Sequence, residues 1–482
     1  MRRLSALLIL FAVSLHAGAD MLKGYEAYQK EDYQTAVTEF RKAAEQGEAL
    51  AQFYLGECYF NGRGVPQDFA TGIDWYSRAA EQGQLEAQET LGGIYFFGKG
   101  VPVDYALAAK WYAGPAEDGK AYPAFLLGYL HDQGQGVSQD SSKAAKYYRI
   151  AAEKGNRDAQ EALAALYFFG RGVGQDYAEA AKWYEEVAAE GRSYPQYLMG
   201  WMYENGQGVA ADPAKAAGWY RKAAEQGEAR AQASLGFLYA QGNGVAQDDG
   251  AALQWFLKAA EQGESSVYSS LAWAYHQGKG TTVDDARAAS WFEKAAATGD
   301  VQARYMLGYL YEEGRGVAKS GEAAARWYRE AAEGGSVAAM EALGALYFFG
   351  NGVAQDYGQA AKWYREPAQQ GGTYAQYLMG YMYEDGKGVD KDPAQAAKWY
   401  KLAAEKGDAR AQTRLGWLYY EGTGVNKDLV EAYMWNNLAA AQLSGEDRAR
   451  VEKVRDFIAS KLEPADLSKA QQRARDWKPK TQ

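Results

Sequence analysis

An aromatic pair, Trp-Tyr or a close variant, returns every 36 residues along most of this 482-residue chain without an insertion. Ten of the fourteen tryptophans occupy the first position of that pair. Its eleven occurrences begin at Trp75, Trp111, Tyr147, Trp183, Trp219, Trp255, Trp291, Trp327, Trp363, Trp399 and Trp435. A fixed period of this length is typical of one supersecondary unit stacked many times, because each unit buries its apolar face only against its neighbours. We therefore expect one elongated array, which offers a long binding surface in place of a single deep catalytic cleft.

Residues 48–83 illustrate how one unit is built. Apolar residues at helical spacing, from Ala51 to Tyr59, predict a first helix with one buried face. A Gly-x-Gly loop follows in all eleven copies and ends this helix, because glycine adopts positive φ without strain. Asp68 then caps a second helix, whose buried face is expected to include Trp75. The predicted fold class is all-α: a right-handed α/α superhelical solenoid of about eleven 36-residue helix-loop-helix repeats with terminal caps.

Two slots of the repeat hold only small side chains. The Ala80 slot is alanine in all twelve copies, and the Gly56 slot is glycine in nine of eleven copies and alanine in the others. Such slots indicate helix axes in close contact. The glycines are therefore interpreted as structural, since a nucleotide-binding loop would need a preceding strand and a third glycine opening the helix.

The complete pattern is L-G-x-x-Y-x-x-G-x-G-V-x-x-D, followed by A-x-x-W-Y-x-x-A-A-x-x-G. It resembles the Sel1-like repeat, a relative of the tetratricopeptide repeat, and covers roughly residues 47–442. The resemblance implies a non-enzymatic scaffold for protein complexes, of a class whose bacterial members are often exported.

The first nineteen residues have the pattern of a secretory signal peptide (residues 1–19). Arg2 and Arg3 precede an apolar run, Leu4–Leu15, and small residues before Asp20 form a cleavage site. An uncleaved membrane anchor is the alternative, but a dozen apolar residues is short against the roughly 20 that a spanning helix needs. We expect an exported protein, periplasmic or secreted, without stable membrane insertion after signal cleavage.

The rest of the chain is expected to form three segments. Residues 20–47 form an N-terminal capping helix pair, residues 48–442 the repeat solenoid, and residues 443–482 the C-terminal capping helices. Within the last segment, Glu446–Leu462 and Asp466–Trp477 have the pattern of charged amphipathic helices. A polar cap on the last repeat is the expected role, and a separate docking tail is the alternative.

Residues with catalytic or ligating chemistry are scarce. The single cysteine, Cys58, occupies an apolar slot and is interpreted as a buried filler. His131 stands in a slot that holds tyrosine elsewhere, and His276 has no Cys or second His at metal-ligand spacing. We therefore expect no enzyme and no catalytic, metal-binding or cofactor-binding residues. A net charge of −10 disfavours a nucleic-acid partner.

The informative departures from the repeat are aromatic. One slot of the first helix lies about 200° from the core and is Glu57 in the first copy, yet aromatic in seven later copies. These candidate partner-binding residues are Tyr129, Trp201, Phe237, Trp273, Tyr309, Tyr381 and Trp417. In related helical solenoids the first helix lines the concave surface, so these side chains predict an aromatic ladder along a groove.

A second departure is the sequence Tyr-Phe-Phe-Gly, which ends the first helix in three copies. Its second phenylalanine, Phe97, Phe169 or Phe349, fills a slot that is Asn, Gln, Glu or Asp elsewhere. Exposure for binding and packing between repeats are both open for these three residues. For the first phenylalanine, Phe96, Phe168 or Phe348, we expect packing, because the outward slot shrinks to Gly or Ala one turn earlier.

These observations favour an exported scaffold or adaptor that binds a protein or peptide through a concave, aromatic-lined face. The alternative is a carbohydrate-binding module for cell-wall glycan or exopolysaccharide, because aromatic faces stack on sugars as well as on peptides. The least favoured alternative is a cell-wall or β-lactam hydrolase. The Sel1-like families credited with hydrolase activity carry a Cys pair in each repeat, and this chain does not.

Overall fold

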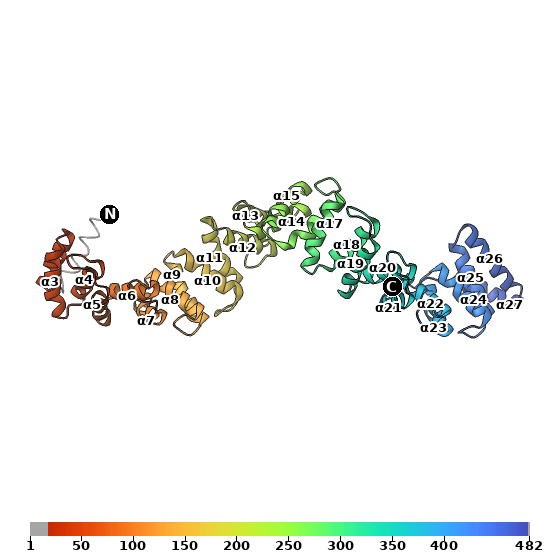
Figure 1. The fold of residues 1–482 in the computed structure, drawn as a ribbon, viewed down its shortest axis with the longest axis horizontal. Coiled ribbons are helices and arrows are strands. Elements are labelled where there is room, and N and C mark those ends of the chain that lie inside the picture. The colour runs from red at the N-terminus through yellow and green to blue at the C-terminus, as the bar shows by residue number, and fades with distance from the viewer. Residues whose placement is uncertain (1–17, 481–482) are drawn as a thin grey trace. The chain divides into compact units, whose positions relative to one another are not determined.

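The computed structural model describes residues 18–480. Residues 1–17, which hold most of the expected signal peptide, lie outside the described residues. Throughout the described part the regular structure is helical, and the helices follow one another in pairs (Figure 1). The expected all-α solenoid of tandem helix pairs is confirmed. The chain divides into two compact units, Met1–Gln247 and Asp248–Gln482.

The first unit contains α2 (Ala19–Gln29), α3 (Tyr33–Glu45), α4 (Ala49–Asn61), α5 (Phe69–Glu81), α6 (Leu85–Phe97), α7 (Tyr105–Glu117), α8 (Ala121–Gln133), α9 (Ser141–Glu153), α10 (Arg157–Phe169), α11 (Tyr177–Ala189), α12 (Ser193–Asn205), α13 (Pro213–Glu225) and α14 (Ala229–Gln241).

The second unit contains α15 (Asp249–Glu261), a 3-10 turn η1 (Ser265–Val267), α16 (Tyr268–Gln277), α17 (Asp285–Ala297), α18 (Val301–Glu313), α19 (Gly321–Glu333), α20 (Val337–Phe349), α21 (Tyr357–Gln369), α22 (Thr373–Asp385), α23 (Pro393–Glu405), α24 (Ala409–Glu421), α25 (Leu429–Gln442), α26 (Gly445–Ala459) and α27 (Pro464–Asp476). From α4 to α25, even-numbered helices are the first of a repeat (helix A) and odd-numbered helices the second (helix B). None of the helices within residues 18–480 is long and apolar enough to cross a membrane.

Both ends of the helices are formed as the sequence predicts. The Asp68 carboxylate accepts a hydrogen bond from the backbone N–H of Thr71 (3.0 Å) and so caps α5. Helix A ends on a glycine in the left-handed conformation, as Gly62 does with φ 69°. Each repeat therefore carries its own start and stop signals, which keeps the register constant along the array.

The second loop glycine also serves the contact between repeats. At Gly172 φ is +70°, and a Cβ there would overlap the backbone of Ser141, which opens helix B of the preceding repeat. Gly155, at the end of a helix B, has φ +82° and open space around it. Glycine is therefore needed at Gly155 for its backbone conformation alone, and at Gly172 also because two repeats meet there.

The two helices of a repeat approach closely around the aromatic pair, and in the first copy the second member is buried more deeply than the first. Tyr76 is buried, and a Cβ on Gly56 would lie 2.9 Å from its ring. Trp75 is only half-buried, and the Arg78 guanidinium lies over its ring at 4.6 Å. Trp75 packs against the core, and its slot is buried at Trp111, Trp183 and Trp435, so the expectation that this slot belongs to the buried face is confirmed. The Gly56 slot admits the flat Tyr76 ring beside it.

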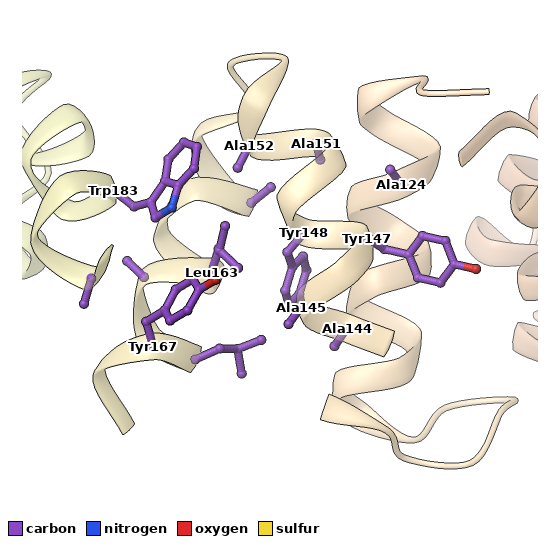
Figure 2. Packing of buried hydrophobic residues seen from close by; sticks show 14 of the residues in the cluster. Ala124, Ala144, Ala145, Tyr147, Tyr148, Ala151, Ala152, Leu163, Tyr167 and Trp183 are labelled. Carbon is purple, nitrogen blue, oxygen red and sulfur yellow. The ribbon is translucent and has the colours of Figure 1, made fainter. Parts of the chain in front are cut away.

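The core between repeats is built from alanines and large rings. Ala144, Ala145, Ala151 and Ala152 line α9, while Tyr148 is buried between neighbouring helices (Figure 2). Small side chains on one face allow the helix axes to approach, and the tyrosine fills the space that remains.

A buried glutamine joins consecutive repeats, a feature that hydrophobic patterning does not predict. The Gln52 side-chain amide donates to the carbonyl oxygen of Ala44 in the preceding helix (3.1 Å). Its own oxygen accepts from the Gln82 amide at the end of the same repeat (2.7 Å). Because a buried amide needs partners for both groups, this residue ties the end of one repeat to the beginning of the next.

At the C-terminal end, α26 and α27 pack on α25. The Trp477 ring lies 6.3 Å from the Trp435 ring, and the Lys480 ammonium pairs with Glu405 at 2.7 Å. The predicted helices of this segment are confirmed to within a few residues.

Candidate functional site

Three phenylalanines at the ends of helices A are more than half exposed. Phe97, Phe169 and Phe349 are 61%, 55% and 54% accessible to solvent. They close α6, α10 and α20, in the slot that is polar in the other copies of the repeat. A large apolar side chain that is mostly in water contributes little to packing, so these residues are the first candidates for contact with a partner.

Each exposed phenylalanine rests on the phenylalanine that precedes it. The Phe168 and Phe169 rings are 5.0 Å apart in an edge-on contact, and the Phe348 and Phe349 rings 4.9 Å apart. Phe168 and Phe348 are only 9% exposed, so the packing expected of them is confirmed. Phe96, in the third copy, is half-buried. One residue of the pair thus belongs to the core and holds the other at the surface.

The buried phenylalanine is enclosed by two further rings, giving three aromatic clusters. Phe168 lies 5.2 Å from Tyr177 in the first turn of helix B and 5.2 Å from Trp201 in the next repeat. We define cluster 1 as Phe96, Phe97, Tyr105 and Tyr129, cluster 2 as Phe168, Phe169, Tyr177 and Trp201, and cluster 3 as Phe348, Phe349, Tyr357 and Tyr381. The sequence interpretation missed Tyr105, Tyr177 and Tyr357. The signal for them is an Asp-Tyr dipeptide following each Tyr-Phe-Phe-Gly.

The seven residues of the predicted aromatic ladder differ in how far they are packed or exposed. Tyr129, Trp201 and Tyr381 are half-buried in the clusters just defined. Trp273 is half-buried against Phe292 at 5.4 Å, and the Tyr309 hydroxyl lies 3.5 Å from the Arg315 guanidinium. Phe237 is half-buried as well, whereas Trp417 is 37% exposed. These side chains therefore offer one face or edge to solvent and rest the other on a neighbouring helix.

Three repeats pair the buried tyrosine with a carboxylate from the end of helix A. The Tyr220, Tyr328 and Tyr400 hydroxyls donate to Glu204, Glu312 and Glu384 at 2.6–2.7 Å. Burial, and then the carboxylate, raise the pKa of each of these tyrosines, so the hydroxyl keeps its proton and remains a donor.

The tyrosine and the acid occur together in only part of the array, because Tyr76, Tyr112, Tyr184 and Tyr364 have phenylalanine in the acid slot. Two repeats hold Phe256 and Phe292 in the tyrosine slot, and their acid slot holds Ala240 and His276. A phenylalanine has no hydroxyl that needs an acceptor, so the acid is dispensable there. The three paired carboxylates thus have a structural partner in the tyrosine hydroxyl.

The cysteine and the two histidines of the described chain each have a structural role. Burial raises the pKa of the Cys58 thiol to about 12, so it is protonated and unreactive at neutral pH. His131 stacks on Tyr147 at 5.9 Å, and His276 Nδ1 lies 2.7 Å from an Asp285 carboxylate oxygen. Among the described residues, no group of three or more His, Cys, Asp or Glu side chains has the arrangement to hold a metal ion.

The sequence model of the Sel1 repeat matches twelve segments that cover most of the chain. They are residues 18–48, 49–84, 85–113, 124–156, 157–191, 196–228, 229–264, 267–300, 301–336, 337–372, 373–408 and 409–442. The first of these segments contains the helix pair α2 and α3, for which a capping role is expected.

The solved structures similar to this chain include two with more than 30% sequence identity. A protective antigen present in uropathogenic Escherichia coli strains, which displays an SLR fold, is 36% identical; the match covers 92% of this chain and 94% of the antigen, with a TM-score of 0.63. A Sel1 repeat protein from Oxalobacter formigenes is 31% identical over 64% of this chain and 89% of its own length, with a TM-score of 0.47. Among curated proteins, none matches.

Proposed function

The chain belongs to the Sel1 repeat family, and we propose that it is an exported, non-enzymatic scaffold that binds a protein or peptide through aromatic side chains on helix A. Repeats of this kind generally mediate protein–protein interaction. The observation that carries the proposal is the exposure of Phe97, Phe169 and Phe349 in a slot that other repeats fill with polar residues. Aromatic side chains contribute large contact area at low conformational cost, which suits them to interface hot spots.

The ladder residues Tyr129, Trp201, Phe237, Trp273, Tyr309, Tyr381 and Trp417 extend this surface within each unit. We expect helix A to line the concave face of a unit, so that the exposed faces of these rings form the floor of a groove and the three phenylalanines its raised points. An extended peptide that lies across successive helices A would meet an aromatic contact at nearly every repeat.

Export is part of the proposal and rests on the sequence of residues 1–19, with Arg2 and Arg3 ahead of an apolar run. A relative described as a protective antigen is consistent with a location outside the cytoplasm. Cell fractionation followed by N-terminal sequencing tests it: a periplasmic or secreted chain that begins at Asp20 is expected, and a cytoplasmic chain that retains Arg2 would contradict it. We further propose that α2 and α3 at one end, and α26 and α27 at the other, cap the array.

Site-specific crosslinking tests partner binding. A photoreactive benzoylphenylalanine replaces Phe169 in one sample and Gln133 in another, because Gln133 is an exposed residue in the same slot of the preceding repeat. Crosslinking in the exporting cell is expected to yield a defined protein adduct from position 169 and much less from position 133.

The captured protein must then bind the purified chain and lose affinity at least tenfold for the triple variant F97S/F169S/F349S with an unchanged circular dichroism spectrum. Equal binding by the triple variant would refute the aromatic surface. A glycan recovered in place of a protein would support the carbohydrate alternative.

A further inference from the structure

The sequence contains a second, longer repeat, with one copy in each of the two units. Residues 157–242 return as residues 337–422, 180 residues later, with a likeness that exceeds the 36-residue pattern. The shared stretches are Tyr-Phe-Phe-Gly, Gln-Asp-Tyr, Ala-Lys-Trp-Tyr, Gln-Tyr-Leu-Met-Gly, Asp-Pro-Ala and Ala-Arg-Ala-Gln. Since 180 residues equal five repeats, the larger motif keeps the register of the small one. One copy lies in each compact unit.

The two copies have the same local geometry. Phe168 and Phe348 each lie 5.2 Å from the tyrosine that opens the next helix B. Gln175 and Gln355 each donate to that tyrosine's hydroxyl oxygen at 3.0 Å. The exposures of Phe169 and Phe349 differ by only one percentage point. Clusters 2 and 3 are therefore two versions of one surface.

A recess lies beside cluster 3, at the junction with the preceding repeat, where the three slots that form a cluster hold no aromatic residue. At this junction the slots that hold Phe, Tyr and Tyr in cluster 3 hold Glu312, Gly321 and Ala345. The recess measures about 520 Å³, and its wall includes Glu312, Glu313 and Asn351. Phe349 is two residues before Asn351 in the chain, so the exposed ring and part of the wall of the recess belong to one short segment.

The recess of cluster 3 carries uncompensated negative charge. Glu312 and Glu313 form no ion pair among residues 18–480, and Lys319 is the one cation in the wall of the recess, so two carboxylates face a single ammonium. The equivalent junction before cluster 2 holds Asp132, Ser141 and Ala165. Within the described chain, the Asp132 Oδ1 atom is buried and has no hydrogen-bond partner. A buried carboxylate oxygen without a donor favours a ligand that supplies one.

Cluster 1 differs at this point and provides an internal control. Its preceding junction is filled by Phe60 and Phe69, whose rings lie 4.9 Å apart, so no acid occupies the slot of Asp132 and Glu312. Phe97 is as exposed as the other two phenylalanines. Cluster 1 therefore has the exposed phenylalanine of the other two clusters but no acidic residue in the corresponding slot.

We infer that clusters 2 and 3, with their acidic junctions, are two equivalent docking sites for one ligand element, a short segment with a basic residue next to an apolar one. The basic side chain enters the acidic junction and the apolar residue lies on Phe169 or Phe349. This inference rests on the proposed function and adds the chemistry and the stoichiometry, two segments for each chain. A partner that carries the segment twice gains avidity of roughly 10²–10⁴ over a single segment when its linker spans both sites.

The probe for the test is a peptide selected from a phage-displayed library of random heptapeptides against the purified chain, with the double variant F169S/F349S as the counter-selection target. The enriched peptides are expected to carry Arg or Lys within two residues of an aromatic or aliphatic side chain. The consensus peptide is then titrated calorimetrically, and two peptides are expected to bind each chain.

Single variants separate the sites. F169S and F349S are each expected to reduce the stoichiometry from two to one and to leave the remaining affinity within about twofold, while F97S leaves the stoichiometry at two. E312Q is expected to weaken one of the two sites about tenfold or more, because it removes a charge-assisted hydrogen bond. A tandem peptide is expected to lose its avidity with either single variant.

The outcomes test this inference separately from the proposed function on which it rests. A library that yields no peptide sensitive to F169S/F349S would count against the aromatic surface itself. Peptides that bind once per chain, or that are lost with only one of the two variants, would leave the surface in place and overturn its duplication. Acidic consensus peptides, or equal loss with F97S, would overturn the assignment of a basic segment.

Discussion

Truncating each member of a Phe-Phe pair in turn should separate the structural role from the binding role. Phe168 is 9% exposed, so F168A removes almost a full buried side chain and leaves a cavity among Tyr177, Tyr184 and Trp201. Phenylalanine truncation in a core costs about 3–5 kcal/mol. Phe169 keeps 55% of its surface in water, so F169A forfeits less than half of the roughly 1.5–3 kcal/mol that complete burial provides, or about 1 kcal/mol.

The two substitutions should therefore differ by about 2 kcal/mol or more, although they are adjacent in sequence and chemically identical. Repeat arrays unfold in parts, so a single global midpoint does not report the local cost. Hydrogen exchange followed by mass spectrometry on peptides from α10 and α11 measures it directly. F348A and F349A provide the matched pair in the other unit, and the same split is expected there.

The result that would refute this reasoning is an equal loss of protection in the two variants. It would mean that Phe169 is held by contacts as costly to remove as those of Phe168, and its exposure would no longer distinguish it from the core. Retained protection in F169A together with lost partner binding would support the division of roles within the pair.

Three further predictions concern the framework. Gly172→Ala should destabilise its surroundings more than Gly155→Ala, which costs about 1–2 kcal/mol for its left-handed backbone, because only Gly172 also abuts the preceding repeat. Equal losses of hydrogen-exchange protection in the flanking helices would contradict the close approach. Cys58, with a pKa of about 12, should resist iodoacetamide at pH 8 until guanidinium unfolds the chain, so rapid native-state labelling would disprove its burial. Glu384→Ala should cost about 1–3 kcal/mol of stability, because it leaves the Tyr400 hydroxyl unpaired, and adding Tyr400→Phe should recover most of that stability. Additive effects in this double-mutant cycle would argue against coupling of the two residues.

The fold could be predicted from the sequence because each repeat states its structure locally. The cap at Asp68, the left-handed Gly62 and the apolar spacing of α4 concern residues within one unit, and all three are seen in the structure. The deeper burial of Tyr76 relative to Trp75 could not be predicted in the same way. Adjacent helical residues differ by about 100° in direction, and the depth of the Tyr76 ring depends on the facing Gly56, which lies on another helix.

The candidate site divides along the same line. The slot comparison singled out Phe97, Phe169 and Phe349, and these three are exposed. It also placed Trp201 on an outward face, yet Trp201 is half-buried, because Phe168 of the preceding repeat leans against it at 5.2 Å. Helical geometry gives the direction of a side chain relative to the axis of its own helix. It does not show which side chains of a neighbouring repeat contact it.

The acidic junctions were missed because their elements belong to two repeats. Glu312 alone gives no signal, because other copies of the repeat also hold an acid in that slot. Ala345 gives none either, because it is one of several small residues in the outward slot. Their combination accompanies the recess at Glu312, and the order acid, small residue and then Phe-Phe puts an exposed ring in the same segment as that recess. This order occurs at Asp132 and Glu312 and is absent where Phe60 takes the acid slot. The 36-residue period therefore specifies the scaffold, whereas the 180-residue period specifies which surfaces of that scaffold are alike, and a ligand that reads one of them should read the other.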